Sequence, residues 1–147
     1  MDYKTEQEWL VIRWFRNHFT DFPKGKLIKD EAPDFRLLVG PKRWIGIEIV
    51  QLVMPEVRHT LQVATYLIES VIIAKEMKAP AYRSRGPQEL WLIIFTDDLD
   101  ISKESELAYL EHPGPARPAF DRVFLFNLFR HSVTEMLSLS AQGYRNK

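Results

Sequence analysis

The sequence has no cysteine among its 147 residues, which excludes a disulfide framework, a thiolate zinc site and a cysteine nucleophile. Long hydrophobic runs are also missing. The apolar stretch from Trp91 to Phe95 is far shorter than the roughly 20 residues that a membrane-spanning helix needs. The first residues do not combine a basic segment with an apolar one, so we expect no secretory signal. These absences predict a cytoplasmic protein without a membrane partner.

An excess of charge of either sign is absent too, because 20 basic residues balance 20 acidic ones. A chain without net charge has no overall attraction to nucleic acid, although a local basic patch can still contact a phosphate backbone. No serine lies in a nucleophile elbow, and no glycine-rich loop is suited to a phosphate. What remains is an ordinary globular composition, 46% hydrophobic and 27% charged, whose length predicts a single domain over residues 1–147.

The hydrophobic pattern alternates between helical and strand periods, which predicts an α/β fold with a mixed sheet flanked by helices. A capping box at Thr5 and Glu8 predicts where the first helix begins, and Phe22-Pro23 predicts where it ends. The expected apolar face of that helix consists of Leu10, Val11, Trp14, Phe15, His18 and Phe19. The other expected elements are strands at 27–28, 35–39 and 43–50, a helix at 57–78, a loop at 79–87, a strand at 90–96, a short helix at 102–110, and strands at 122–129 and 133–139.

The most informative residues are Asp34, immediately before the first strand of the predicted hairpin at 35–50, and Glu48, in its second strand. Strand side chains alternate between faces, so Glu48 is an acid inside an otherwise hydrophobic strand and needs a cation, a metal or several donors. The hairpin brings Asp34 close to Glu48, and a divalent cation between them would relieve their repulsion. Ligands that are all oxygen favour Mg²⁺ or Mn²⁺ over zinc. The structural alternatives are a turn role for Asp34 and an arginine or lysine that satisfies Glu48.

Pro33-Asp34 followed by Glu48-Ile49-Val50, between one helix and a second, longer one, resembles the PD-(D/E)XK nuclease superfamily over residues 5–96. The resemblance implies a restriction-endonuclease-like α-β-β-β-α-β core, to which the C-terminal strands are appended. It also implies that Asp34, Glu48 and the carbonyl of Ile49 bind Mg²⁺ or Mn²⁺. An accessory acid on the first helix, Glu8 or Glu6, is then expected to hydrogen-bond a water on the metal.

This sequence departs from the superfamily pattern at the lysine position two residues after the glutamate, which is Val50. The resemblance implies that this lysine orients or activates the attacking water, which valine cannot do. On the next helix, Gln62 and Tyr66 resemble the Q-h-x-x-Y pattern of RecB-type nucleases, and Gln62 is the expected replacement for the lysine. Lys75 is expected to lie too far along the helix, more than three turns beyond Gln62, to reach a site at the start of the helix.

Four basic residues are expected to guide a nucleic-acid backbone: Lys29, Lys42, Arg43 and Arg85. The resemblance therefore implies a metal-dependent endonuclease that hydrolyses phosphodiester bonds in nucleic acid, with DNA as the favoured substrate. The alternative is a catalytically inactive protein with the same fold, which binds nucleic acid, another protein or a second copy of itself. A toxin or immunity-type protein on this fold is a third hypothesis. A divalent cation at the two carboxylates distinguishes the enzyme from a pure binding module.

Overall fold

The computed structural model describes residues 2–53, 61–97 and 119–138, and its centre is a mixed six-stranded sheet in the order β1-β2-β3-β4-β5-β6. The chain from β1 to β3 pairs antiparallel, β3, β4 and β5 are parallel, and β6 returns antiparallel to β5. The strands are β1 (Lys26–Lys29), β2 (Phe35–Gly40), β3 (Arg43–Gln51), β4 (Glu89–Thr96), β5 (Arg122–Asn127) and β6 (Ser132–Ser138). The predicted α/β class with a mixed sheet is confirmed.

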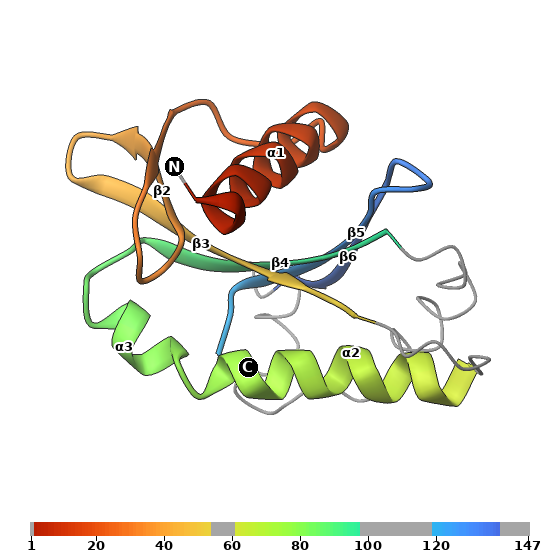
Figure 1. Cartoon of the computed structure of the whole chain (residues 1–147). Helices are drawn as coiled ribbons and strands as arrows, with labels where there is room; N and C mark the ends of the chain where they lie inside the picture. Colours follow the sequence, from red (N-terminus) through yellow and green to blue (C-terminus); the bar gives the residue numbers. More distant parts are fainter. Residues whose placement is uncertain (1, 54–60, 98–118, 139–147) are drawn as a thin grey trace.

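Helix α1 (Tyr3–His18) covers one face of the sheet, and α2 (Leu61–Glu76) and the short α3 (Ala79–Arg83) cover the other (Figure 1). Parallel strands such as β3 and β4 must be joined by a crossover, which here contains α2 and α3. Because β3 and β4 run in the same direction, the crossover has to return the chain to the edge of the sheet where β3 begins before β4 can start. Late residues of α2, rather than early ones, therefore lie beside the middle of β3.

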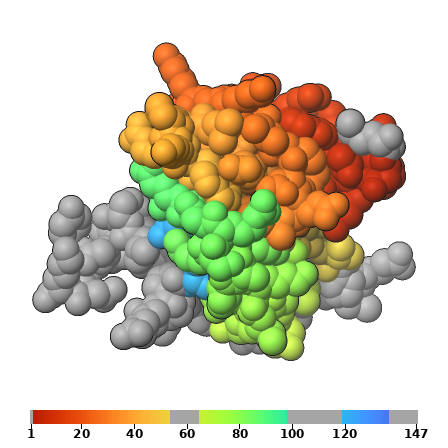
Figure 2. Space-filling model, turned by 90° about the vertical axis from the view of Figure 1, so that its left-hand side faces the viewer, coloured from red at the N-terminus to blue at the C-terminus, as the bar shows by residue number. Residues whose placement is uncertain are grey.

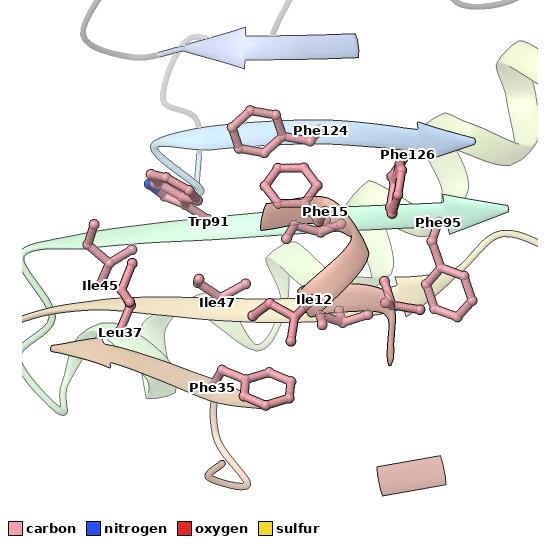
Figure 3. Close-up of a cluster of buried hydrophobic side chains, with 13 residues drawn as sticks. Ile12, Phe15, Phe35, Leu37, Ile45, Ile47, Trp91, Phe95, Phe124 and Phe126 are labelled. Atoms are coloured by element: carbon pink, nitrogen blue, oxygen red, sulfur yellow. The ribbon is translucent and has the colours of Figure 1, made fainter. Parts of the chain in front are cut away.

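The sheet face under α1 is a core of aromatic and branched side chains (Figure 3). Phe15 of α1 is fully buried, and its ring lies 5.0 Å from that of Phe124, edge to face. Fully burying a side chain of this kind contributes roughly 1.5–3 kcal/mol relative to its exposure, so this cluster anchors α1 to the sheet. Its buried members are Val11, Ile12, Phe15, Phe35, Leu37, Ile45, Ile47, Ile49, Trp91, Ile93, Phe95, Phe124 and Phe126.

The opposite face holds an aliphatic cluster from α2, α3 and the central strands, which includes Leu52, Ile68, Ile72, Leu90, Leu92, Ile94 and Leu125. Glu48 is the exception within β3, because it is an acid that is only 3% exposed. The isoleucines on either side of Glu48 belong to the aromatic core under α1, which confirms the predicted alternation along this strand. The fold thus places one carboxylate between the sheet and its second helical layer.

Helix α1 differs from the prediction in its ends and in its buried face. Its N-cap is Asp2, whose carboxylate accepts a 2.7 Å hydrogen bond from the Thr5 amide, so the capping box at Thr5 is wrong. The helix ends at His18, well before the predicted Pro23. Leu10 and Trp14 are 62% and 44% exposed, because the buried face is rotated toward Glu8, Val11, Ile12 and Phe15. This rotation turns Glu8 toward the sheet.

The remaining elements follow the sequence closely. The hairpin at 35–50 is confirmed, with one extra residue at the end of each strand, and the short first strand and both closing strands are present. The predicted loop at 79–87 is wrong in part, because Ala79–Arg83 form α3, which accepts Pro80 in its first turn. The predicted helix at 102–110 lies outside the described residues. None of the helices within 2–53, 61–97 and 119–138 combines the length and hydrophobicity of a membrane span.

Candidate active site

The β2–β3 hairpin brings Asp34 and Glu48 together, as the sequence predicts. Phe35 pairs with Ile47, so Asp34, immediately before β2, lies opposite Glu48. The Asp34 amide donates a 3.1 Å hydrogen bond to Glu48 Oε1, and the Ile49 amide donates a 2.9 Å hydrogen bond to Asp34 Oδ2. Each carboxylate is thus held by the backbone of the neighbouring segment. Both are buried, with exposures of 9% for Asp34 and 3% for Glu48.

A glycine in β3 allows the segment before Asp34 to come this close. A Cβ atom on Gly46 would lie 2.8 Å from Cγ of Pro33 and 3.1 Å from a methyl carbon of Leu90. These distances are shorter than side chains tolerate, so a residue larger than glycine would push Pro33 away from the sheet. Gly46 therefore helps to determine where the Asp34 carboxylate lies.

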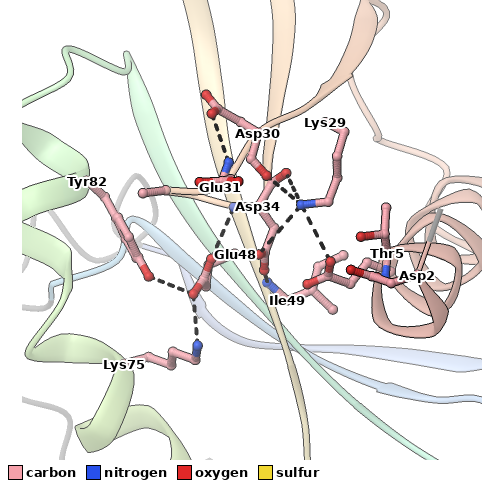
Figure 4. A network of polar contacts seen from close by, with 12 residues as sticks. Asp2, Thr5, Lys29, Asp30, Glu31, Asp34, Glu48, Ile49, Lys75 and Tyr82 are labelled. Atoms are coloured by element: carbon pink, nitrogen blue, oxygen red, sulfur yellow. Dashed lines mark hydrogen bonds and ion pairs between the residues drawn. The ribbon is translucent and has the colours of Figure 1, made fainter.

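Glu48 receives two donors from the helical layer on its side of the sheet (Figure 4). Lys75 Nζ of α2 lies 2.8 Å from Glu48 Oε2, and the hydroxyl of Tyr82 of α3 donates a 2.7 Å hydrogen bond to the same oxygen. The prediction that Lys75 lies too far along its helix is wrong, because α2 runs back along β3 and brings its last turn to Glu48. The parallel pairing of β3 and β4 requires that return, so an assignment of the connection as a crossover would have identified Lys75.

The cation beside Asp34 is Lys29 of β1, which lies on the side of the sheet that α1 covers. Lys29 Nζ lies 3.9 Å from Asp34 Oδ1 and 3.5 Å from Glu8 Oε1, and it donates a 3.1 Å hydrogen bond to the carbonyl oxygen of Asp34. Glu8 is 5% exposed, so the accessory acid of the prediction is a buried residue that points toward this cluster. Glu6, the other candidate, lies in the first turn of α1 and is not among the buried residues of that helix. The cluster contains three acids and two lysines.

The pKa values of the two central carboxylates move in opposite directions. Burial, followed by the charge of Glu48, raises the pKa of Asp34 to about 8, although the hydrogen bond from the Ile49 amide works against both effects. Burial also acts to raise the pKa of Glu48, but hydrogen bonds from Lys75, Tyr82 and Asp34 outweigh it and hold this pKa below its ordinary range. Burial and the adjacent Glu48 raise the pKa of the Tyr82 hydroxyl, which therefore keeps its proton. The surroundings of the pair therefore favour the protonated form of Asp34 and the ionised form of Glu48.

The two residues of the Q-h-x-x-Y pattern lie away from this cluster. Gln62 precedes Lys75 by 13 residues in α2, which is about 20 Å along the helix axis, and its side chain lies outside the described part. Tyr66 is 68% exposed, and its described contact is a carbonyl that accepts a hydrogen bond from Ser70. Helix α2 therefore presents Lys75 to Glu48.

The four basic residues of the prediction separate into two groups. Lys29 is part of the buried cluster. Lys42 and Arg43 are exposed at the tip of the β2–β3 hairpin, and the side chain of Arg85, after α3, is 41% exposed and pairs with Asp30 at 3.0 Å. Figure 2 faces this end of the molecule, where the orange atoms of the hairpin region adjoin the green atoms of α3. Arg85 also donates a hydrogen bond of 2.6 Å to the carbonyl of Ala32, which ties α3 to the segment before Asp34.

The oxygen-rich surroundings of Asp34 and Glu48 suit Mg²⁺ better than a softer metal. Within the described residues, no three acidic, histidine or cysteine side chains converge on one point as a complete metal cage. Mg²⁺ does not require such a cage, because it usually takes one or two carboxylates and retains several waters. Asp34 and Glu48 supply two neighbouring carboxylates. The raised pKa of Asp34 also reflects a repulsion that a divalent cation would relieve.

Comparison with protein-family models, with curated proteins and with solved structures gave no match to this chain.

Proposed function

We propose that this protein is a divalent-metal-dependent nuclease of the PD-(D/E)XK type, which hydrolyses phosphodiester bonds in nucleic acid, with DNA as its favoured substrate. In this proposal the chain has a restriction-endonuclease-like core. Asp34, Glu48 and the carbonyl of Ile49 hold Mg²⁺ or Mn²⁺. The observation that carries the proposal is the buried Asp34–Glu48 pair with Lys75 bonded to it at 2.8 Å.

In this proposal Lys75 replaces the motif lysine, whose position in the sequence is taken by Val50. Val50 cannot donate a hydrogen bond or carry charge, but Lys75 reaches Glu48 from the helical layer on the same side of β3. In the proposed reaction Lys75 orients the attacking water and offsets the charge of the scissile phosphate. Tyr82 keeps its proton and holds Glu48 in position.

The metal supplies two effects when it is bound: it lowers the pKa of a coordinated water and neutralises charge on the phosphate. The side chains of the protein hold the metal and bind the nucleic acid. Asp34 must release its proton to become a ligand, because its pKa is about 8 in the metal-free protein. Lys42, Arg43 and Arg85 are the exposed cations that contact the nucleic-acid backbone in this proposal.

A second function, a catalytically inactive binding module, is favoured by one specific observation. Both oxygens of Glu48 already have partners within the chain, since Oε1 accepts from the Asp34 amide and Oε2 from Lys75 and Tyr82. A cluster that is satisfied in this way can be a purely structural network. The two functions differ in whether the protein binds a divalent cation through Asp34 and Glu48.

The test is to incubate the purified protein with plasmid, linear, single-stranded and branched DNA and with RNA, in Mg²⁺, Mn²⁺ or EDTA. Asp34→Ala, Glu48→Ala and Lys75→Met are compared with the native protein. We expect metal-dependent cleavage that each substitution lowers by at least about 100-fold, as is common for residues that position or activate the reacting groups. Circular dichroism of each variant shows whether a loss of cleavage follows a loss of folding.

Two exposed residues of the same helical layer provide matched controls. Glu69→Gln in α2 removes an exposed acid, and Lys78→Met removes an exposed lysine three residues after Lys75. We expect neither to change cleavage by more than about twofold, because exposed side chains remote from the cluster contribute little to it. Absence of cleavage on every substrate, together with absence of Mn²⁺ binding by calorimetry, would reject the nuclease in favour of the binding module.

A further inference from the structure

Lys29, the last residue of β1, ends in a cluster made of oxygen atoms (Figure 4). Its ammonium donates hydrogen bonds to the carbonyl oxygens of Asp30 and Asp34, and it lies 3.5 Å from Glu8 Oε1 and 3.9 Å from Asp34 Oδ1. The ring of Phe35 lies below it, with 5.1 Å between Nζ and the ring centroid. Two carboxylates and two carbonyls therefore surround one positive charge.

The backbone builds this cluster independently of the lysine. The Asp30 amide donates a 2.7 Å hydrogen bond to the carbonyl of Asp34, which closes the turn between β1 and β2. Arg85 holds the same turn from outside, through Asp30 and the carbonyl of Ala32. The Asp34 carbonyl, and the turn that carries Asp30, are thus held in place by contacts that do not involve the Lys29 side chain.

The acids around Lys29 are buried, and buried acids need a positive charge nearby. The side chains of Glu8 and Asp34 are only 7% and 13% exposed, and that of Lys29 is 24% exposed. A buried carboxylate without a positive partner is costly, so a neutral residue at position 29 would leave Glu8 uncompensated. Carboxylate and carbonyl oxygens are also the ligands that Mg²⁺ and Mn²⁺ prefer.

We propose that the Lys29 ammonium occupies the place of a second divalent cation, between Glu8, Asp34 and the carbonyls of Asp30 and Asp34. Lys29 thereby limits the native protein to one ion, at Asp34 and Glu48. The first ion rests on the proposed function, whereas the site at Lys29 rests on the contacts of Lys29 alone. Removal of the lysine opens this second site, and the ion that enters it is held by Glu8.

The experiment measures the stoichiometry of Mn²⁺ binding, by calorimetry and by electron paramagnetic resonance, in the native protein and in Lys29→Met. We expect about one ion per chain in the native protein and about two in the variant, because the vacated oxygens are hard ligands for a divalent ion. The extra ion should disappear in the double variant Glu8→Gln/Lys29→Met. Lys26→Met, an exposed lysine of the same strand, is the matched control and should retain the native stoichiometry.

Thermal unfolding provides a second measurement, with Lys29→Gln as a second variant because glutamine retains hydrogen-bond donors without charge. Both variants should unfold several degrees below the native protein in EDTA. Mn²⁺ should raise their midpoints more than it raises the native midpoint, since a ligand stabilises the folded state that binds it.

The outcomes separate this inference from the proposed function. One ion in the native protein and one in Lys29→Met overturns the inference and leaves the nuclease proposal intact. No ion in the native protein and one in Lys29→Met supports the site at Lys29 and counts against the nuclease. No ion in any of these proteins overturns both.

Discussion

Asp34 and Glu48 are neighbouring carboxylates on one hairpin, but they receive their cations from opposite faces of the sheet. Glu48 has two donors within 2.8 Å, Lys75 and Tyr82, from the layer of α2 and α3. Asp34 has Lys29, at 3.9 Å, from the side of α1. The difference explains why the pKa of Glu48 is lowered and that of Asp34 is raised to about 8. A carboxylate that is buried behind a distant cation retains its proton, and one with a direct partner loses it.

This asymmetry also assigns different roles to the two residues. Glu48 is an ionised group whose position is determined by protein donors. Asp34 is the group whose pKa is raised. Within the proposed function, Glu48 anchors the metal and Asp34 makes its binding depend on pH.

The largest expected effect comes from removing the cation of Glu48. Lys75→Met should lower the free energy of unfolding by about 3–5 kcal/mol, since it leaves a buried charge without its partner. Glu48→Gln should cost less, because the side chain of Lys75 is 19% exposed and its amino group can turn to water. Urea denaturation of both variants at pH 8 measures the difference. A Lys75→Met variant that is as stable as the native protein would show that Glu48 does not depend on Lys75.

A smaller effect is expected at the second donor of Glu48. Tyr82→Phe removes only the hydroxyl, and hydrogen bonds to charged groups contribute roughly 1.5–3 kcal/mol. The ring remains to fill its buried place among the aliphatic residues, so the loss should come from the hydrogen bond alone. Denaturation shows the loss, and a rise in the pKa of Glu48, followed by carbon NMR of its carboxyl, identifies the cause. An unchanged Glu48 pKa would contradict the role of Tyr82.

The smallest change in stability is expected for Asp34→Asn near pH 5, because asparagine resembles the protonated acid that the native protein contains there. The pKa of Asp34 is raised from 3.8 to about 8 on folding, so between these values the folded chain holds a proton that the unfolded chain releases. The contribution of Asp34 is present in full below its unfolded pKa and is lost as pH rises through about 8. Without metal, the native midpoint should therefore fall between pH 5 and pH 8 more steeply than that of Asp34→Asn. Parallel profiles would show that Asp34 is already ionised near neutral pH.

Most of the secondary structure that depends on short stretches of sequence was predictable from the sequence. The hairpin of β2 and β3 follows from two runs of branched and aromatic residues around Gly40-Pro41-Lys42, and it brought Asp34 to Glu48 as expected. The buried strand at β4 follows from its continuous apolar run. The N-cap of α1 differs from the prediction because Asp2 and Thr5 are both residue types that cap helices, and the sequence does not decide between them.

The partners of the two carboxylates were not predictable from local patterns. The distance along α2 predicts that Lys75 is remote from a site at the start of that helix, whereas the crossover between parallel strands brings the helix back along β3. Tyr82 lies in α3, where the sequence predicts a loop, and the spacing of Glu8 from Thr5 also fits a capping box. Each of these contacts joins elements that are far apart in the sequence.

The sequence by itself determined the α/β class, the hairpin and the pair of acids, because those features depend on the periodicity of side chains and on short turns. The tertiary structure alone decided which cation each acid receives, and therefore which of them keeps its proton. Burial and charge act through space over a few ångströms, and only the packing of α1, α2 and α3 against the sheet brings Lys29, Lys75 and Tyr82 within that range.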